Sequence, residues 1–141
     1  MTPTATVETS VVIDAIEGTD PAAVSLFARA IAGDFDLAVS TRVWHELSRS
    51  EPPPELRSYL TRIAPLGAPA RYGISRYGSG DYWAGGYDAA AGNDLDGDHV
   101  AAHRRSGRAF FISRDRRQLS RARKAGCDAM TAEDFLAKFP G

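Results

Sequence analysis

Cysteine is almost absent from this 141-residue chain, which has Cys127 alone. One cysteine cannot form an intramolecular disulfide, so nothing here indicates an oxidising compartment. The segment from Met1 to Ser10 lacks the basic start and the apolar stretch of a secretory signal, and no apolar run approaches the roughly 18 residues that span a bilayer. We therefore expect a cytoplasmic protein without a membrane partner.

Two common kinds of functional motif are also missing. No cysteine–histidine set has the spacing of a zinc site, and no glycine-rich loop with a lysine is present to hold a nucleotide phosphate. The stretch Asp94–Asp98 begins like a calcium-binding EF-hand loop, but that loop needs glycine at its sixth position and glutamate at its twelfth. Those positions hold His99 and Arg105, so the EF-hand match fails.

The composition is typical of one soluble domain with its own core, with 43% hydrophobic and 25% charged residues. We expect a single domain over residues 1–141. Short apolar runs alternate with segments of helical spacing, which predicts an α/β fold in three layers, with a mainly parallel sheet between helices. The expected strands are Ser10–Ile13, Phe35–Ser40, Ala109–Ile112 and Cys127–Met130, the last at or near a sheet edge.

Residues that commonly begin or end helices mark several of the expected helices. Asp20 followed by Pro21 predicts a helix start, and Thr131 with Asp134 three residues later resembles a capping box. Gly107 stands where a glycine usually follows the end of a helix.

Acidic residues gather where expected strands end or helices begin. Because the carboxyl ends of parallel strands meet at one edge of a sheet, such residues can share one pocket. Several carboxylates stay ionised together only beside a cation, and a ligand set made of oxygens suits Mg²⁺ or Mn²⁺. The residues concerned are Asp14, Glu46, Asp94, Asp96, Asp98 and Asp115.

A basic segment accompanies these acids. From His99 to Lys124 the chain has nine basic residues and one acid, Asp115. A basic surface beside clustered carboxylates suits a metal-dependent enzyme that acts on a polyanion, although a solvated basic helix face would look the same. With a hard divalent ion, the pattern indicates phosphodiester hydrolysis by a metal-activated water. The arginines expected to contact phosphates are Arg104, Arg105, Arg114 and Arg116.

The order of the acids resembles that of PIN domains, including the VapC-type toxin ribonucleases. That family has an acid ending the first strand, a glutamate on a following helix, an aspartate opening a late helix and an aspartate just past the next strand. Its late segment often has small residues and a glycine before an apolar strand that ends in Thr/Ser-x-Asp, as does Ser113-Arg114-Asp115 here. The four acids that match are Asp14, Glu46, Asp96 and Asp115.

The resemblance covers nearly the whole chain and implies a PIN-like fold with Mg²⁺- or Mn²⁺-dependent endoribonuclease activity. Asp14, Asp96 and Asp115 would hold the ion, and Glu46 would bind it or orient the water. Asp94 and Asp98 compete with Asp96 for its role, and Asp98 is retained as a metal ligand.

Other roles follow from the same resemblance. Ser113 would assist near the metal, and His99 and His103 would have structural roles or lie beside the metal ligands rather than bind the ion. RNA would be the substrate, contacted by the four arginines named above. Likeness to VapC-type toxins also implies an antitoxin partner and a homodimer.

Residues 67–93 depart from the helical hairpin that the PIN family usually has there. Seven glycines, four tyrosines and a tryptophan predict a long irregular loop or insertion. Its arginines and tyrosines could stack on bases or contact a protein. The rival hypothesis is therefore a non-catalytic PIN-like module that binds RNA or protein through this loop. A receiver domain fits less well, because Asp14 lacks an acidic neighbour at the expected strand end.

Overall fold

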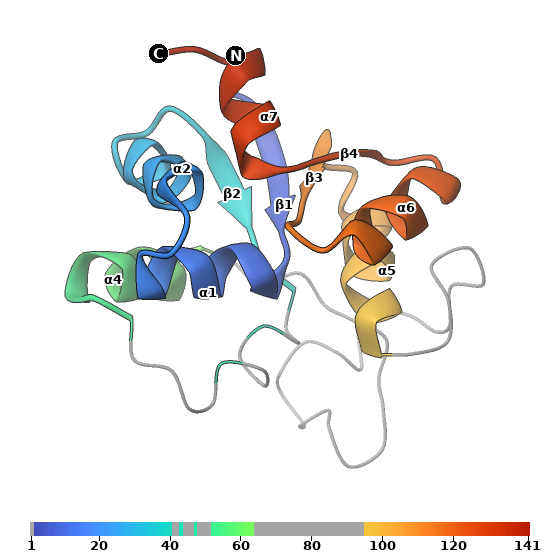
Figure 1. Ribbon diagram of the computed structural model, residues 1–141, viewed down its shortest axis with the longest axis horizontal. Coiled ribbons are helices and arrows are strands. Elements are labelled where there is room, and N and C mark those ends of the chain that lie inside the picture. The colour runs from blue at the N-terminus through green and yellow to red at the C-terminus, as the bar shows by residue number, and fades with distance from the viewer. Residues whose placement is uncertain (1, 41–42, 44–46, 48–51, 64–94) are drawn as a thin grey trace.

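The computed structural model describes residues 2–40, 43, 47, 52–63 and 95–141, without the side chains of residues 62, 95 and 96. In this part of the chain, helices flank a four-stranded parallel sheet on both faces (Figure 1). The predicted three-layer α/β fold is therefore confirmed. Two predicted features, the loop at residues 67–93 and the helix segment carrying Glu46, lie outside the described residues.

The sheet has the strand order β2-β1-β3-β4, and every neighbouring pair is parallel. β1 and β3 form its centre, and Ala5 of β1 is paired with a residue of β2 on one side and of β3 on the other. β4 is an edge strand, as predicted. The strands are β1 Thr4–Val7, β2 Asp36–Ala38, β3 Phe110–Ile112 and β4 Asp128–Met130.

The described residues form six helices. Two connect β1 to β2, two more precede β3, one connects β3 to β4, and the last follows β4. Within this part of the chain, none is long and apolar enough to cross a membrane. They are α1 Thr9–Glu17, α2 Pro21–Ile31, α4 Pro54–Arg62, α5 Leu95–Ser106, α6 Arg116–Lys124 and α7 Ala132–Lys138.

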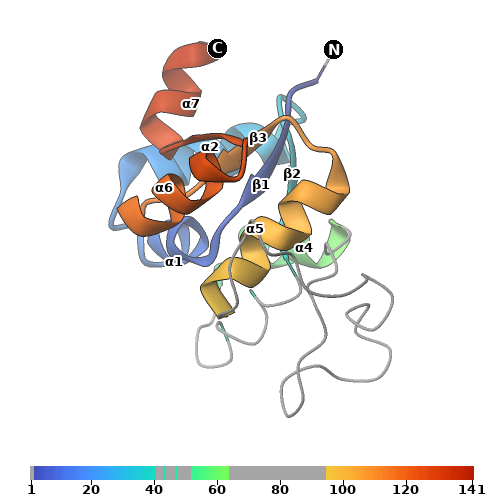
Figure 2. The same cartoon turned by 90° about the vertical axis from the view of Figure 1, so that its right-hand side faces the viewer.

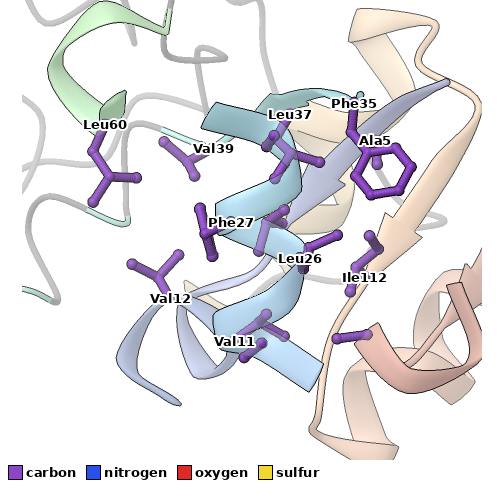
Figure 3. Packing of buried hydrophobic residues seen from close by; sticks show 14 of the residues in the cluster. Ala5, Val11, Val12, Leu26, Phe27, Phe35, Leu37, Val39, Leu60 and Ile112 are labelled. Atoms are coloured by element: carbon purple, nitrogen blue, oxygen red, sulfur yellow. The ribbon is translucent and has the colours of Figure 1, made fainter. Parts of the chain in front are cut away.

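The two faces of the sheet bury separate cores, because successive side chains of a strand point to opposite faces. The larger core packs α1, α2, α4 and α7 against one face, and Ala5 and Ile112 point into it (Figure 3). The smaller core packs α5 and α6 against the other face around Phe111 and Ala129. Figure 2 faces this second side of the molecule. Successive side chains of β3 and β4 thus pack alternately against the helices on the two faces of the sheet.

The connections diverge at the centre of the sheet. The chain leaves β1 toward β2 and leaves β3 toward β4, which are opposite directions across the sheet. Right-handed crossovers then place α1 and α2 on one face and α6 on the other. In open α/β sheets ligands bind in the crevice where such connections part, at the carboxyl ends of the strands. Here that place lies just after Val7 and Ile112.

The predicted strand Ser10–Ile13 is wrong. The first strand is Thr4–Val7, and the apolar run after it belongs to α1. Glu8 begins this helix, since its carboxylate accepts a hydrogen bond from the backbone N–H of Ser10 at 3.1 Å. Val11 is buried in the larger core on the inner face of the helix. A short run of β-branched residues fits a buried strand and a buried helix equally well.

The residues predicted to begin or end helices do so in the structure. The Asp20 carboxylate accepts from the backbone N–H of Ala22 at 3.0 Å at the start of α2. The Thr131 hydroxyl accepts from the backbone N–H of Asp134 at 3.2 Å at the start of α7. Gly107, with φ of 71°, follows α5 in the left-handed region that glycine adopts without a Cβ penalty. These short-range predictions are confirmed.

The packing of α7 on the sheet can be tested at Phe135, which is fully buried with its ring centroid 4.8 Å from that of Phe35 and 5.5 Å from that of Phe110. We expect Phe135→Ala to lower the free energy of unfolding by about 3–5 kcal/mol, because it removes the ring and leaves a cavity. Urea unfolding followed by circular dichroism would measure this. Val24→Ala on α2, where the side chain is 44% exposed, is the control and should change it by about 0.5 kcal/mol or less. Equal effects would contradict the described packing.

Candidate functional site at the carboxyl ends of β1 and β3

Glu8 lies where the sheet connections diverge. Its backbone N–H donates to Ile112 O at 2.9 Å, which extends the β1–β3 pairing by one residue. Its side chain is buried, and Oε2 accepts from the Ser10 hydroxyl as well as from the Ser10 backbone. Oε2 also accepts from the Ser113 hydroxyl at 2.9 Å. All side-chain hydrogen bonds of Glu8 with described residues therefore involve one oxygen, Oε2, and Oε1 takes part in none of them.

Ser113 connects the ends of three neighbouring strands. It directly follows β3, and its backbone N–H donates to Met130 O of β4 at 3.1 Å. Its buried hydroxyl donates to Glu8 after β1 and accepts from the Asp115 backbone N–H at 3.0 Å. One hydroxyl thus orders both the buried carboxylate and the turn that leads to Asp115.

Asp115 lies just past the end of β3 and begins α6. Its Oδ1 accepts from the Arg117 backbone N–H at 2.8 Å, the bond of a helix N-cap. The residue is exposed, so its carboxylate faces solvent close to the buried Glu8–Ser113 pair. The two acids at the ends of the central strands therefore differ in environment, one buried and one open to solvent.

Two histidine–threonine hydrogen bonds attach α5 to β1 and to the start of α1. His99 Nε2 lies 3.4 Å from Thr9 Oγ1, and His103 Nδ1 lies 2.7 Å from Thr6 Oγ1. The two histidines are four residues apart on α5 and therefore share one side of the helix, along which both bonds form. α5 consequently begins at the carboxyl edge of the sheet, and Asp98, 1% exposed, lies next to His99 there.

His103 is a structural histidine rather than a group that titrates near neutral pH. Its side chain is buried against the Phe111 ring, with centroids 5.4 Å apart. Burial, and to a lesser extent the positive charge of Arg108, lowers the pKa of His103 to about 4. The imidazole is therefore neutral at physiological pH.

Asp14, the acid assigned by sequence to the end of the first strand, lies within α1. Its Oδ1 accepts from the Thr19 hydroxyl at 3.0 Å, and its Oδ2 pairs with Arg114 Nε at 2.7 Å. A residue expected to hold the metal thus pairs with one expected to hold RNA. The expected position of Asp14 was wrong because the first strand ends earlier, at Val7.

The arginines expected to contact phosphates divide between two edges of the sheet. Arg114 and Arg116 line a groove of about 780 Å³ along α6, which begins at the carboxyl edge. Arg104 lines a hollow of about 440 Å³ beside Asp128 at the amino end of β4. Arg105 shares the last turn of α5. Only the first two arginines therefore lie near the strand-end acids.

The described acids alone do not make up a metal centre. In residues 2–40, 43, 47, 52–63 and 95–141, no three acidic, histidine or cysteine side chains come close enough together to hold an ion. Glu46, Asp94 and the side chain of Asp96 lie outside the description. Of the predicted metal ligands, the three with described side chains, Asp14, Asp98 and Asp115, do not form such a group by themselves.

Glu8 is the residue that sequence reasoning missed. It directly follows the short run Ala5-Thr6-Val7, and Thr9 and Ser10 come next. Hydroxyl residues such as Thr9 and Ser10 are favoured at the start of a helix. Reading that signal would have ended the strand at Val7 and placed Glu8, rather than Asp14, at the edge of the sheet.

Comparisons with protein-family models, with curated proteins and with solved structures found no significant match to this chain.

The buried histidine predicts a pH dependence of stability. The unfolded chain binds a proton on His103 below about pH 6.5, whereas the folded protein binds it only near pH 4. Stability that is present above pH 6.5 is therefore lost as the pH falls toward 4, by about 3 kcal/mol in total. Urea unfolding between pH 7.5 and about 4 would compare the wild type with His103→Gln, which can keep the Thr6 hydrogen bond but does not titrate. Parallel pH profiles for the two proteins would contradict the assignment.

Proposed function

We propose that this protein is a Mg²⁺- or Mn²⁺-dependent endoribonuclease with a PIN-like fold. The observation that carries the proposal is the buried carboxylate of Glu8 where the sheet connections diverge, joined through Ser113 to the turn that bears Asp115. In α/β sheets this is the place where ligands bind. Hydrolysis of this kind relies on an ion to activate a water and to neutralise charge on the phosphate.

The proposal revises the roles suggested by sequence. Glu8 takes the strand-end role that Asp14 was expected to have, and Asp115 keeps the role after β3. The third acid is Asp96 or Asp98 at the start of α5, which the histidine–threonine bonds hold against β1. Glu46 remains the proposed fourth acid. Ser113 orients Glu8, which agrees with the assisting role proposed for it.

A buried carboxylate is expensive to keep, which supports a functional reason for Glu8. Removing an ionised carboxylate from water costs several kcal/mol, and the cost is recovered only through hydrogen bonds or opposite charge. A serine or threonine at this position would cap α1 as well and would bury no charge. The longer glutamate side chain extends farther along the β1–β3 junction. Its hydrogen bonds with described residues all involve Oε2.

The rival function, a non-catalytic RNA- or protein-binding module, is supported by a different observation. The acids at and near this edge all have structural partners: Glu8 caps α1, Asp115 caps α6, and Asp14 pairs with Arg114. In that case the carboxylates stabilise the fold, and the basic face of α6 alone would bind the ligand.

Cleavage assays on a mixed single-stranded RNA pool, with Mn²⁺ and with EDTA, separate the two functions. We expect cutting with Mn²⁺ and none with EDTA. Glu8→Gln should reduce the rate by about 100-fold or more, because the amide can still cap α1 and bond to Ser113 but carries no charge. Asp128→Asn, an exposed carboxylate at the opposite edge, is the matched control and should cut at the wild-type rate.

Asp14→Asn decides between the two placements of the first acid. If Glu8 has that role, Asp14→Asn should retain more activity than Glu8→Gln, and circular dichroism should show both variants folded. Loss of activity in Asp14→Asn with full activity in Glu8→Gln would overturn the revised assignment. No metal-dependent cutting by the wild type, with no heat on titrating in Mn²⁺, would favour the binding module.

The likeness to VapC-type toxins adds two partners to the proposal, an antitoxin protein and a second copy of the chain. Light scattering of the purified chain tests the homodimer directly. An antitoxin should bind the folded protein and suppress the cleavage described above.

A further inference from the structure

The groove along α6 is lined by basic and hydroxyl side chains, and no acid is among its lining residues in the described part of the chain. Leu119 forms an apolar part of its wall. Its volume of about 780 Å³ is nearly twice the 440 Å³ of the hollow at the other edge of the sheet. The polar lining residues are Arg114, Arg116, Ser120, Arg123, Lys124 and Thr131.

The positive charge of the groove is not explained by helix stability. Lys124 stands in the last turn of α6, where a cation is favoured by the helix dipole. Arg116, however, stands in the first turn, where the same dipole disfavours a cation. Neither side chain forms a hydrogen bond or an ion pair with described residues, so both charges are available to an anion.

Two other cations are already held in place. Arg123 donates from Nε and Nη2 to Ala129 O at 3.1 and 2.9 Å, which fixes its guanidinium beside the groove. Arg114 is fixed by its pair with Asp14 at the opposite end. A groove with fixed cations at two points loses less side-chain entropy when it binds an anion than one formed by free side chains.

The groove starts beside the strand-end acids. Arg114 is the second residue after β3, Thr131 directly follows β4, and Asp115 stands between Arg114 and Arg116 in the chain. From Arg116 to Lys124 the helix rises about 12 Å. An anionic chain with one phosphate near Glu8 and Asp115 could therefore continue past Arg116 and reach Lys124.

We infer that the α6 groove binds the sugar–phosphate backbone of a single RNA strand and holds the nucleotides next to the bond that is cut. This inference rests on the proposed ribonuclease function. It assigns Lys124, Arg123, Ser120 and Thr131 to substrate binding, in addition to the arginines expected from the sequence to contact phosphates. Phosphate contacts of this kind do not discriminate between base sequences, and their contribution to affinity depends strongly on the salt concentration.

Fluorescence anisotropy with a labelled single-stranded RNA, in EDTA so that nothing is cut, tests the groove separately from catalysis. The test variant is Arg116→Gln/Lys124→Gln. The control is Arg57→Gln/Arg117→Gln, which removes the same charge from two exposed arginines that do not line the groove. Both variants are measured across a salt series beside the wild type.

Loss of two phosphate contacts should lower the slope of log K against log salt by about 1.4 and weaken binding roughly 20-fold at 0.1 M salt. The control should stay within about threefold of the wild type, the size of a screened long-range effect. Equal weakening in both variants, or none in the groove variant, would overturn the inference.

Two further outcomes separate the groove from the proposed activity. If the groove variant alone loses RNA binding while the wild type cuts no RNA with Mn²⁺, the RNA-binding groove stands and the ribonuclease proposal fails. If polyglutamate binds the wild type and not the groove variant, while RNA binding is the same in both, the groove belongs to an acidic protein and the inference is overturned.

Discussion

The junction between β1 and β3 holds the two halves of this protein together. β1 leads through α1 and α2 to β2 on one side, and β3 leads through α6 to β4 on the other, so the central pair is the only described strand pairing between the halves. At its carboxyl end, Glu8 donates from its backbone to Ile112 and accepts at its side chain from Ser113. Both cores are anchored on these two strands, whose alternate side chains supply opposite faces.

The same junction concentrates polar side chains that hydrogen-bond to one another. Buried carboxylates and hydroxyls are stable only when their hydrogen bonds are satisfied, and Ser10 and Ser113 satisfy those of Glu8 Oε2. On the other face, His103 and His99 hydrogen-bond to threonines and so position α5 against β1 and the start of α1. The arrangement brings the start of α5 and the turn before α6 to one edge, where a phosphodiester could meet acids and cations together.

Charge is distributed in a way that suits a polyanion. The chain as a whole has a formal net charge of −1 at pH 7, yet the groove along α6 is lined by cations alone among its charged residues in the described region. A local positive field of this kind attracts phosphates even when the whole protein is nearly neutral. The acids nearby cap helix starts or pair with Arg114, and none of the described acids lines the groove that Arg116 and Lys124 border.

The features that depend on near neighbours in the chain could be predicted from the sequence. Asp20 and Thr131 mark helix starts, and Gly107 marks a helix end. The apolar runs of β2, β3 and β4 predict a parallel sheet with β4 at its edge. The position of the first strand could not be predicted from the sequence, because Val11 and its apolar neighbours fit a buried helix as well as a strand. Tertiary structure alone decided that the Glu8 carboxylate accepts from Ser113 and that Asp14 pairs with Arg114, 100 residues away. The physical reason is that backbone propensity acts between near neighbours, whereas the partners of a charged side chain are chosen by which elements the sheet brings side by side.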